Sequence, residues 1–294
     1  MAQIIDGKAI AKDIRREVRE EVERLVEEGK PTPGLNLLLV GEDPASEIYV
    51  RNKAKDCEQV GIRSTIVRMD ATVSEGSVIR QVEAWNADPN VHGILVQLPL
   101  PKHIDEFKVI RTIAPFKDVD GFHPENAGKL LIGLDGFVPC TPAGVLEMLK
   151  RTGIDISGKH AVVVGRSNIV GKPLAMLLAQ KRSPGNATVT ICHTGTRDLA
   201  EHTRRADLLV AAVGKAGVIT RELVKEGAVV IDVGINRIER EDGTTYMTGD
   251  VDFGPVSEIA QAITPVPGGV GPMTRACLLL NTLKATRQFA EGRS

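Results

Sequence analysis

Three side chains with polar or reactive ends recur every four residues early in the sequence. Tyr49, Lys53 and Cys57 stand one helical turn apart, so a helix here presents a phenol, an amine and a thiol on one face. Gln97 is a polar residue inside the otherwise apolar run 94–98, which Pro99 ends, and Asp120 follows in the segment 117–122. An amine among such groups can act as an acid or base where its surroundings disfavour the ammonium form. This set is the first candidate site.

A glycine-containing turn is the second candidate site. Gly165 follows the apolar run 162–164 and precedes a predicted helix, a context in which helix amides and close backbone approach favour phosphate binding. The usual dinucleotide fingerprint is altered, because Ser167 takes the second glycine position and Gly171 comes one residue late. Pro173 replaces the hydroxyl residue of a P-loop, which excludes an NTPase.

The residues beyond this turn favour NADP over NAD. An NAD-binding sheet carries an acidic residue about 20 positions on, at the end of its second strand. Here the strand ends in Cys192–Arg197, which holds Thr194 and Arg197 but no acid, and Arg166 sits beside the first glycine. Hydroxyls and arginines suit a 2′-phosphate. The alternative is that both arginines are solvated surface charges.

The four cysteines point to no metal or disulfide framework. They lie far apart without a Cys-x-x-Cys pair, and we expect each to be a small buried hydrophobe. Asp118 and Asp120 form a pair of carboxylates, but the sequence supplies no further metal ligands beside them.

The elements that must position these groups form an alternating pattern. An apolar stripe at 10, 14, 18, 22 and 25 predicts a first helix, Asp43–Pro44 predicts the start of the helix carrying Lys53, and a further helix starts near Ser74. Apolar runs predict strands at 35–40, 64–69, 93–98, 161–164, 188–191, 208–212 and 229–233. A last helix is expected at 276–289, after a Pro/Gly-rich loop at 264–274.

This pattern predicts two α/β domains, the second a Rossmann-like doubly wound parallel sheet. With 294 residues, two domains are also the natural expectation from size. We place the first at residues 1–139 plus the C-terminal helix 275–294, and the second at 140–274.

Composition and charge exclude several partners. Lys and Arg number 37 against 38 Asp and Glu, so no global field attracts a nucleic acid backbone. No stretch approaches the roughly 18 apolar residues of a membrane span, and the start lacks a signal-like segment, so we expect a cytoplasmic protein.

Six segments together resemble the family of bifunctional methylenetetrahydrofolate dehydrogenase/methenyltetrahydrofolate cyclohydrolase. They span nearly the whole chain, and the last is long and unusual. The segments are 46–53 (SEIYVRNK), 97–101 (QLPLP), 117–122 (KDVDGF), 139–142 (PCTP), 164–171 (VGRSNIVG) and 264–274 (TPVPGGVGPMT).

The resemblance implies a fold and an activity. Two lobes would flank a cleft, the first holding folate and the second NADP, in a homodimer. The enzyme would oxidise 5,10-methylenetetrahydrofolate to the 5,10-methenyl form with NADP and hydrolyse that to 10-formyltetrahydrofolate. It would serve one-carbon metabolism and purine biosynthesis.

The resemblance also assigns roles by position. Lys53 resembles the general acid/base of the hydrolytic step, Tyr49 the residue that stacks on the pterin, Gln97 a polar partner of Lys53, and Asp120 the pterin anchor. The implied cofactor positions are Gly165, Arg166, Ser167, Thr194 and Ile235. The implied substrate positions are Tyr49, Lys53, Gln97, Leu98, Asp120, Pro265, Gly268 and Gly269.

Two alternatives remain at this point. A monofunctional dehydrogenase of the same family would share the fold but lack a hydrolytic centre, which Lys53 and Gln97 argue against. A non-catalytic nucleotide sensor would use the Gly165 turn alone and would have no need of a reactive amine.

Overall fold

The computed structural model describes residues 1–240 and 242–292. The chain forms two compact units, each with its own parallel sheet: Met1–Ala11 with Thr141–Thr274, and Lys12–Cys140 with Arg275–Ser294. We call the first the six-strand unit and the second the three-strand unit. Residues 293 and 294, the end of the expected C-terminal helix, lie outside the described residues.

The first eleven residues differ from the sequence-based division. We assigned them to the first domain, but they join the six-strand unit. The reason is β1 (Gln3–Ile4), which pairs in parallel with β11 (Ala262–Ile263). A strand of two residues carries too little pattern to be predicted from sequence.

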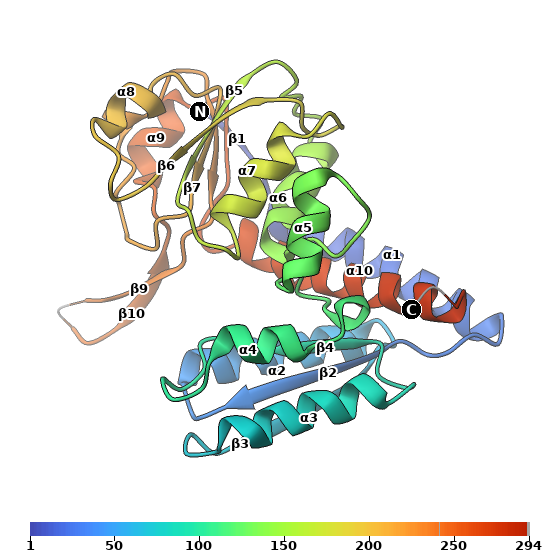
Figure 1. Ribbon diagram of the computed structural model, residues 1–294. Coiled ribbons are helices and arrows are strands. Elements are labelled where there is room, and N and C mark those ends of the chain that lie inside the picture. The colour runs from blue at the N-terminus through green and yellow to red at the C-terminus, as the bar shows by residue number, and fades with distance from the viewer. Residues whose placement is uncertain (241, 293–294) are drawn as a thin grey trace. The chain divides into compact units, whose positions relative to one another are not determined.

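The three-strand unit has a parallel sheet in the order β3-β2-β4. The strands expected at 35–40 and 64–69 are confirmed, whereas the one expected at 93–98 ends at Val96. The Lys53 helix starts as predicted, with the Asp43 carboxylate accepting from the Ser46 amide at 2.8 Å. Figure 1 shows α2 and α3 on either side of β2. The bounds are β2 (Gly34–Val40), α2 (Pro44–Gln59), β3 (Arg63–Met69), α3 (Glu75–Ala87), β4 (Gly93–Val96), α4 (Glu106–Thr112), η1 (Pro115–Lys117) and α5 (Pro124–Ile132).

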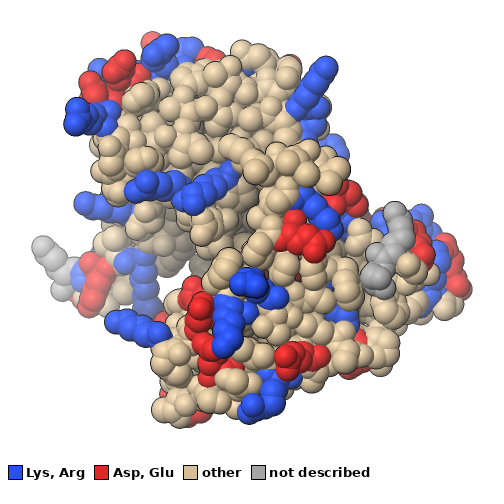
Figure 2. All heavy atoms as spheres, in the orientation of Figure 1, with Lys and Arg blue, Asp and Glu red and all other residues tan. Residues whose placement is uncertain are grey.

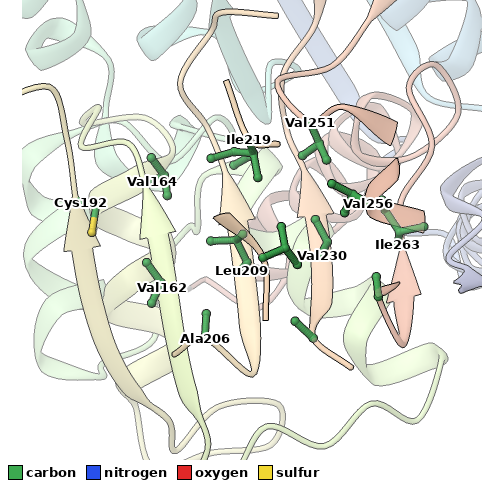
Figure 3. Packing of buried hydrophobic residues seen from close by; sticks show 14 residues of the cluster. Val162, Val164, Cys192, Ala206, Leu209, Ile219, Val230, Val251, Val256 and Ile263 are labelled. Carbon is green, nitrogen blue, oxygen red and sulfur yellow. The ribbon is translucent and has the colours of Figure 1, made fainter. Parts of the chain in front are cut away.

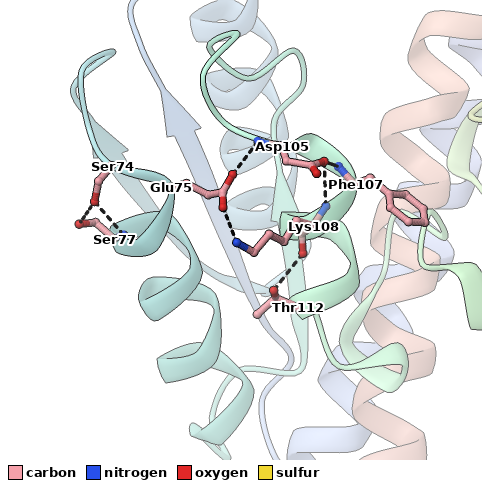
Figure 4. A network of polar contacts seen from close by, with 7 residues as sticks. All are labelled: Ser74, Glu75, Ser77, Asp105, Phe107, Lys108 and Thr112. Carbon is pink, nitrogen blue, oxygen red and sulfur yellow. Dashed lines mark hydrogen bonds and ion pairs between the residues drawn. The ribbon is translucent and has the colours of Figure 1, made fainter.

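Helices α3 and α4 share one apolar cluster on one face of this sheet, and a polar network joins them at the surface. Glu75, in the first turn of α3, accepts from the Asp105 amide at 2.9 Å and from Lys108 Nζ at 2.5 Å. Asp105 in turn caps α4 by accepting from the Phe107 and Lys108 amides (Figure 4). The start of α3 is thereby fixed to the start of α4.

The six-strand unit has an entirely parallel sheet in the order β1-β11-β8-β7-β5-β6. The chain runs from β5 outward to β6 and then returns to β7 on the other side of β5. That reversal makes the carboxyl ends of β5 and β7 the topological switch point, where open α/β sheets bind ligands. The strands are β5 (His160–Val164), β6 (Thr188–Cys192), β7 (Leu208–Ala211) and β8 (Val229–Asp232).

The remaining elements of this unit surround the sheet. An antiparallel hairpin of β9 and β10, which the sequence patterns did not predict, follows β8. The bounds are α7 (Gly171–Ala179), α8 (Leu199–Thr203), η2 (Arg221–Leu223), β9 (Asn236–Glu239), β10 (Thr245–Thr248) and α9 (Phe253–Ile259).

The core of the six-strand unit is aliphatic. Val162 and Val164 of β5, Leu209 of β7 and Val230 of β8 lie side by side in one buried cluster, joined by Ile263 of β11 (Figure 3). Because side chains alternate along a strand, this face packs together while the opposite face is free to meet other helices. This packing holds the strands together, so the positions of the loops that follow their carboxyl ends are fixed as well.

Three helices lie at the division between the two units along the chain. These are α1 (Gly7–Glu27), α6 (Cys140–Arg151) and α10 (Val270–Ala290). The last begins six residues earlier than predicted, so part of the expected Pro/Gly-rich loop is helical. Pro272 is tolerated because it stands in the first turn, where its missing N–H has no helical partner to lose.

The surface bears both signs of charge. Figure 2 shows Lys and Arg interspersed with Asp and Glu on the visible face. None of the helices within residues 1–240 and 242–292 is long and apolar enough to cross a membrane.

Candidate functional site

Lys53 and Gln97 meet in the three-strand unit. Lys53 lies on α2 and is half-buried, and its Nζ donates to Gln97 Oε1 at 3.0 Å. Gln97 follows directly on β4, so its side chain stands at the carboxyl end of the sheet, as the sequence predicted. Tyr49 lies one turn before Lys53 on the same helix and is 39% exposed, which leaves its ring open to a ligand.

The orientation of the Gln97 amide follows from its partners. Lys53 can only donate, so the amide oxygen must face it, and Nε2 then donates to the Leu98 carbonyl oxygen at 2.8 Å. The Gln97 backbone amide donates to the Leu38 carbonyl at 2.9 Å, which ties this residue to β2. Both ends of the side chain are therefore specified.

Asp120 completes this cluster. Burial raises the pKa of its carboxyl above the ordinary value, and the neighbouring Asp118 adds to the rise, while the positive charge of Lys53 and the Cys140 thiol act in the opposite direction. The structure thus brings Tyr49, Lys53, Gln97 and Asp120 into one unit, with Lys53 close enough for its charge to act on Asp120.

The segment that carries Asp120 is held by Lys117 and Asp118. The Lys117 ammonium, 3% exposed, donates to the carbonyls of Trp85, Asn86 and Asp88 at 3.0, 2.9 and 2.7 Å and so closes the end of α3. The Asp118 carboxylate accepts from the amides of Phe122 and His123 and from Asn126 Nδ2.

Cys140 and Asn281 hold the other side of this segment, and the sequence did not mark either for the site. Asn281 Nδ2 donates to the carbonyls of Val119 and Val138 at 2.8 and 3.0 Å. Burial raises the pKa of the Cys140 thiol well above its ordinary value, and the nearby Asp120 carboxylate adds to this. All four cysteines are buried, as expected.

In the six-strand unit, the glycine turn is set by contact between backbones. Gly165 has a φ of +141°, and a Cβ on it would overlap the Ala212 carbonyl oxygen. A Cβ on Gly171 would likewise overlap the Gly165 carbonyl oxygen. Both glycines are required for the tight passage from β5 to α7, and this shape fits a nucleotide phosphate turn.

Arg166 and Thr194 lie exposed at the same edge of the sheet. Val164 pairs with Cys192, so the residues after β5 and β6 start side by side. The Ser167 hydroxyl, next along the turn, accepts from the amides of Val170 and Gly171 at 3.1 and 3.3 Å. In this structure it caps the start of α7, which orients the turn.

Ile235, Pro265, Gly268 and Gly269 line one hollow of about 80 Å³ in the six-strand unit. The start of α1 holds one of these lining residues, because the Lys8 amide donates to the Gly268 carbonyl at 2.9 Å. The residues expected to bind substrate therefore fall into both units, with Leu98 beside Gln97 in the three-strand unit. Among the described residues, no group of three or more His, Cys, Asp or Glu is arranged to hold a metal ion.

Two family models match the chain. Residues 5–120 match the catalytic domain of tetrahydrofolate dehydrogenase/cyclohydrolase, and residues 139–290 match the NAD(P)-binding domain of the same family. The first covers Lys53, Gln97 and Asp120, and the second covers the glycine turn.

Full-length relatives agree with these models. A bifunctional protein FolD of Moorella thermoacetica is 58% identical over 98% of this chain and 99% of its own length, and one of Chloroherpeton thalassium is 54% identical over 97% and 99%. The crystal structure of the bifunctional FolD dehydrogenase/cyclohydrolase of Campylobacter jejuni superposes with a TM-score of 0.93 at 46% identity, covering 98% and 99% of the two chains. The Trypanosoma brucei FolD, crystallised with NADP and an inhibitor, gives 0.92 at 40% identity, covering 100% and 99%.

The buried Lys117 generates a stability prediction. In Lys117→Met, three carbonyls at the end of α3 lose a charged donor, so the free energy of unfolding should fall by about 2 kcal/mol or more. Lys108→Met removes an exposed lysine whose ion pair with Glu75 is at the surface and screened by solvent, so it should cost far less than Lys117→Met. Urea unfolding of the two variants measures both values, and equal losses would contradict the capping role of Lys117.

Proposed function

The chain belongs to the tetrahydrofolate dehydrogenase/cyclohydrolase family, and on that basis we propose that it catalyses two successive reactions on one folate. It oxidises 5,10-methylenetetrahydrofolate to 5,10-methenyltetrahydrofolate with NADP and then hydrolyses the product to 10-formyltetrahydrofolate. The observation that carries the hydrolytic half is the 3.0 Å hydrogen bond between Lys53 and Gln97 beside Asp120.

Bound NADP supplies the acceptor for the hydride that leaves the methylene carbon. The glycine turn and the exposed Arg166 and Thr194 fit this group, because a Cβ at Gly165 would fill the space that the backbone needs. We assign Gly165, Arg166, Ser167, Thr194 and Ile235 to NADP binding, with Ser167 acting through the start of α7. Hydride transfer requires alignment of the two rings but no acid or base.

Hydrolysis needs proton transfers that Lys53 can perform. As water attacks the methenyl carbon, the Lys53 amine takes one of its protons, and the resulting ammonium returns a proton to the ring nitrogen when its carbon–nitrogen bond breaks. The remaining hydroxyl proton leaves as the formyl carbonyl forms, so one proton is released overall. The Gln97 oxygen orients the amine throughout.

The other site residues bind and orient the folate. The exposed ring of Tyr49 is available to stack on the pterin, and the Asp120 carboxyl is available to hydrogen-bond its polar edge. Leu98, Pro265, Gly268 and Gly269 would bind the rest of the substrate. Gln97 and Lys53 also contact it at the reacting carbon.

We also propose a cytoplasmic homodimer whose product supplies formyl groups for purine biosynthesis. Four cysteines buried as thiols are in keeping with a reducing compartment. The family resemblance supports the dimer and the pathway.

A two-wavelength assay tests the proposed function. Methylenetetrahydrofolate and NADP are supplied, and NADPH and methenyl absorbance are followed together. NADPH should form without accumulation of the methenyl signal. NADPH with a persistent methenyl signal would indicate a monofunctional dehydrogenase, and no NADPH would leave only a nucleotide sensor.

Lys53→Met should separate the two reactions. Without the amine, hydrolysis should fall by about 100-fold or more, because that is the usual contribution of a positioned acid or base. Hydride transfer should remain measurable. Lys55→Met is the matched control, since this exposed lysine on the same helix points away from Gln97. If both activities of Lys53→Met fall together, Lys53 positions substrate and does not move protons.

Arg166→Ala should weaken NADP far more than NAD. Loss of a charge-assisted contact to the 2′-phosphate should raise the KM for NADP by about tenfold or more, with little change for NAD, which lacks this phosphate. Steady-state rates with each dinucleotide measure the effect. Arg205→Ala, an exposed arginine in the same unit, is the control. Equal losses for both dinucleotides would show that the 2′-phosphate assignment is wrong.

A further inference from the structure

A fully buried carboxylate holds the loop that follows β7. Asp250 Oδ2 accepts from the backbone amides of Val213 and Gly214 at 2.6 and 2.9 Å, and Oδ1 accepts from the Lys215 amide at 3.0 Å. Three consecutive amides that converge in this way form a concave anion-binding site. Here the protein's own side chain occupies it, so the loop conformation is fixed from within.

A second buried carboxylate holds Asp250 itself. Asp232, the last residue of β8, accepts from the amides of Gly234 and Asp250 through Oδ1 and from the Val251 amide through Oδ2, each at 2.9 Å. Asn236 Nδ2 donates to Asp250 Oδ1 at 2.9 Å. The two carboxylates therefore connect the loop after β7, the end of β8 and the β9–β10 hairpin.

The surrounding glycines fit this arrangement. A Cβ on Gly234 would overlap the Asp250 carboxylate, and a Cβ on Gly249 would overlap that of Asp232. Each carboxylate occupies the space that a side chain on the opposite glycine would need. Ile235, the neighbour of Gly234, lines the hollow formed with Pro265, Gly268 and Gly269. The network of carboxylates therefore extends to the lining of this hollow.

The loop that Asp250 holds stands at the topological switch point. The Ala212 amide donates to the Val164 carbonyl at 2.8 Å, and the Ala212 carbonyl oxygen is the atom that a Cβ on Gly165 would overlap. The loop after β7 is thus in direct backbone contact with the glycine turn. Its position sets how much space lies beside that turn.

We propose that Asp250 is a positioning residue for dinucleotide binding, which it serves by fixing the loop 213–215 against the Gly165 turn. It does not touch the cofactor. The proposal rests on the proposed function, in which NADP lies at this edge of the sheet. A purely structural role would lower stability but leave the affinity of the folded protein for dinucleotide unchanged.

The test uses Asp250→Asn in the full-length chain. Asn keeps the size of the side chain but sets an amide group against the loop's N–H donors, which should release the loop. We expect the Kd for NADPH, measured by calorimetry well below the unfolding temperature, to rise by about tenfold or more. Hydrolysis of methenyltetrahydrofolate, supplied directly, should be retained, because that step needs no dinucleotide.

Asp252→Asn is the matched control, because this exposed carboxylate lies two residues away. It should leave the Kd unchanged. If Asp250→Asn does not fold, Gly214→Pro tests the same loop, since it removes one of the three donors at an exposed position and cannot adopt the observed φ of +73°. The same selective loss is expected.

An unchanged Kd in folded Asp250→Asn, or in Gly214→Pro where the first variant does not fold, would overturn the inference. Parallel loss of NADPH affinity and methenyl hydrolysis would also overturn it, because the effect would then extend beyond the dinucleotide site. Failure of the unaltered chain to bind NADPH would overturn the proposed function itself, and the two failures are therefore distinguishable.

Discussion

The hydrogen bond from Lys53 to Gln97 is the interaction on which the proposed hydrolytic chemistry depends. It joins a side chain from the middle of α2 to one at the carboxyl end of β4, so each residue fixes the orientation of the other. The bond exists because α2 packs along the sheet while β4 stops at Val96. The amine is thereby held at a strand end, where parallel sheets present polar groups to ligands.

Backbone geometry plays the corresponding role in the six-strand unit. Gly165 and Ala212 approach so closely that a side chain on the glycine cannot be accommodated, and this contact places two loops together at the switch point. The loop after β7 is held by the buried Asp250 carboxylate, which accepts from three of its backbone amides. We therefore propose that phosphate recognition by this unit depends on its buried carboxylates as well as on the exposed Arg166.

Much of this arrangement could be predicted from local patterns. Asp43 and Pro44 mark the start of α2 because capping is a local interaction. Apolar runs mark β2, β4, β5, β7 and β8 because the burial of these strands is nearly complete. Gln97 could be identified because a polar residue near the carboxyl end of an apolar strand in a parallel sheet is expected to face a ligand. Its contact with Lys53, 44 residues away, became an expectation only through the family resemblance.

What escaped prediction depends on contacts distant in sequence. Lys117 looks like any lysine until its three carbonyl partners, about 30 residues away, are known. Asp250 binds amides more than 30 residues earlier, so its role has no local signature. The early start of α10 was missed because proline and glycine usually indicate a loop, whereas the first helical turn tolerates both.

The pH–rate profile of methenyl hydrolysis, compared between the unaltered chain and Gln97→Glu, tests the central claim most directly. A carboxylate in place of the amide oxygen should stabilise the ammonium form of Lys53. The rise in rate with pH should therefore move to higher pH, while hydride transfer keeps its own profile. Hydrolysis profiles that superimpose would contradict the account, because they would show that Lys53 does not exchange protons under the influence of residue 97.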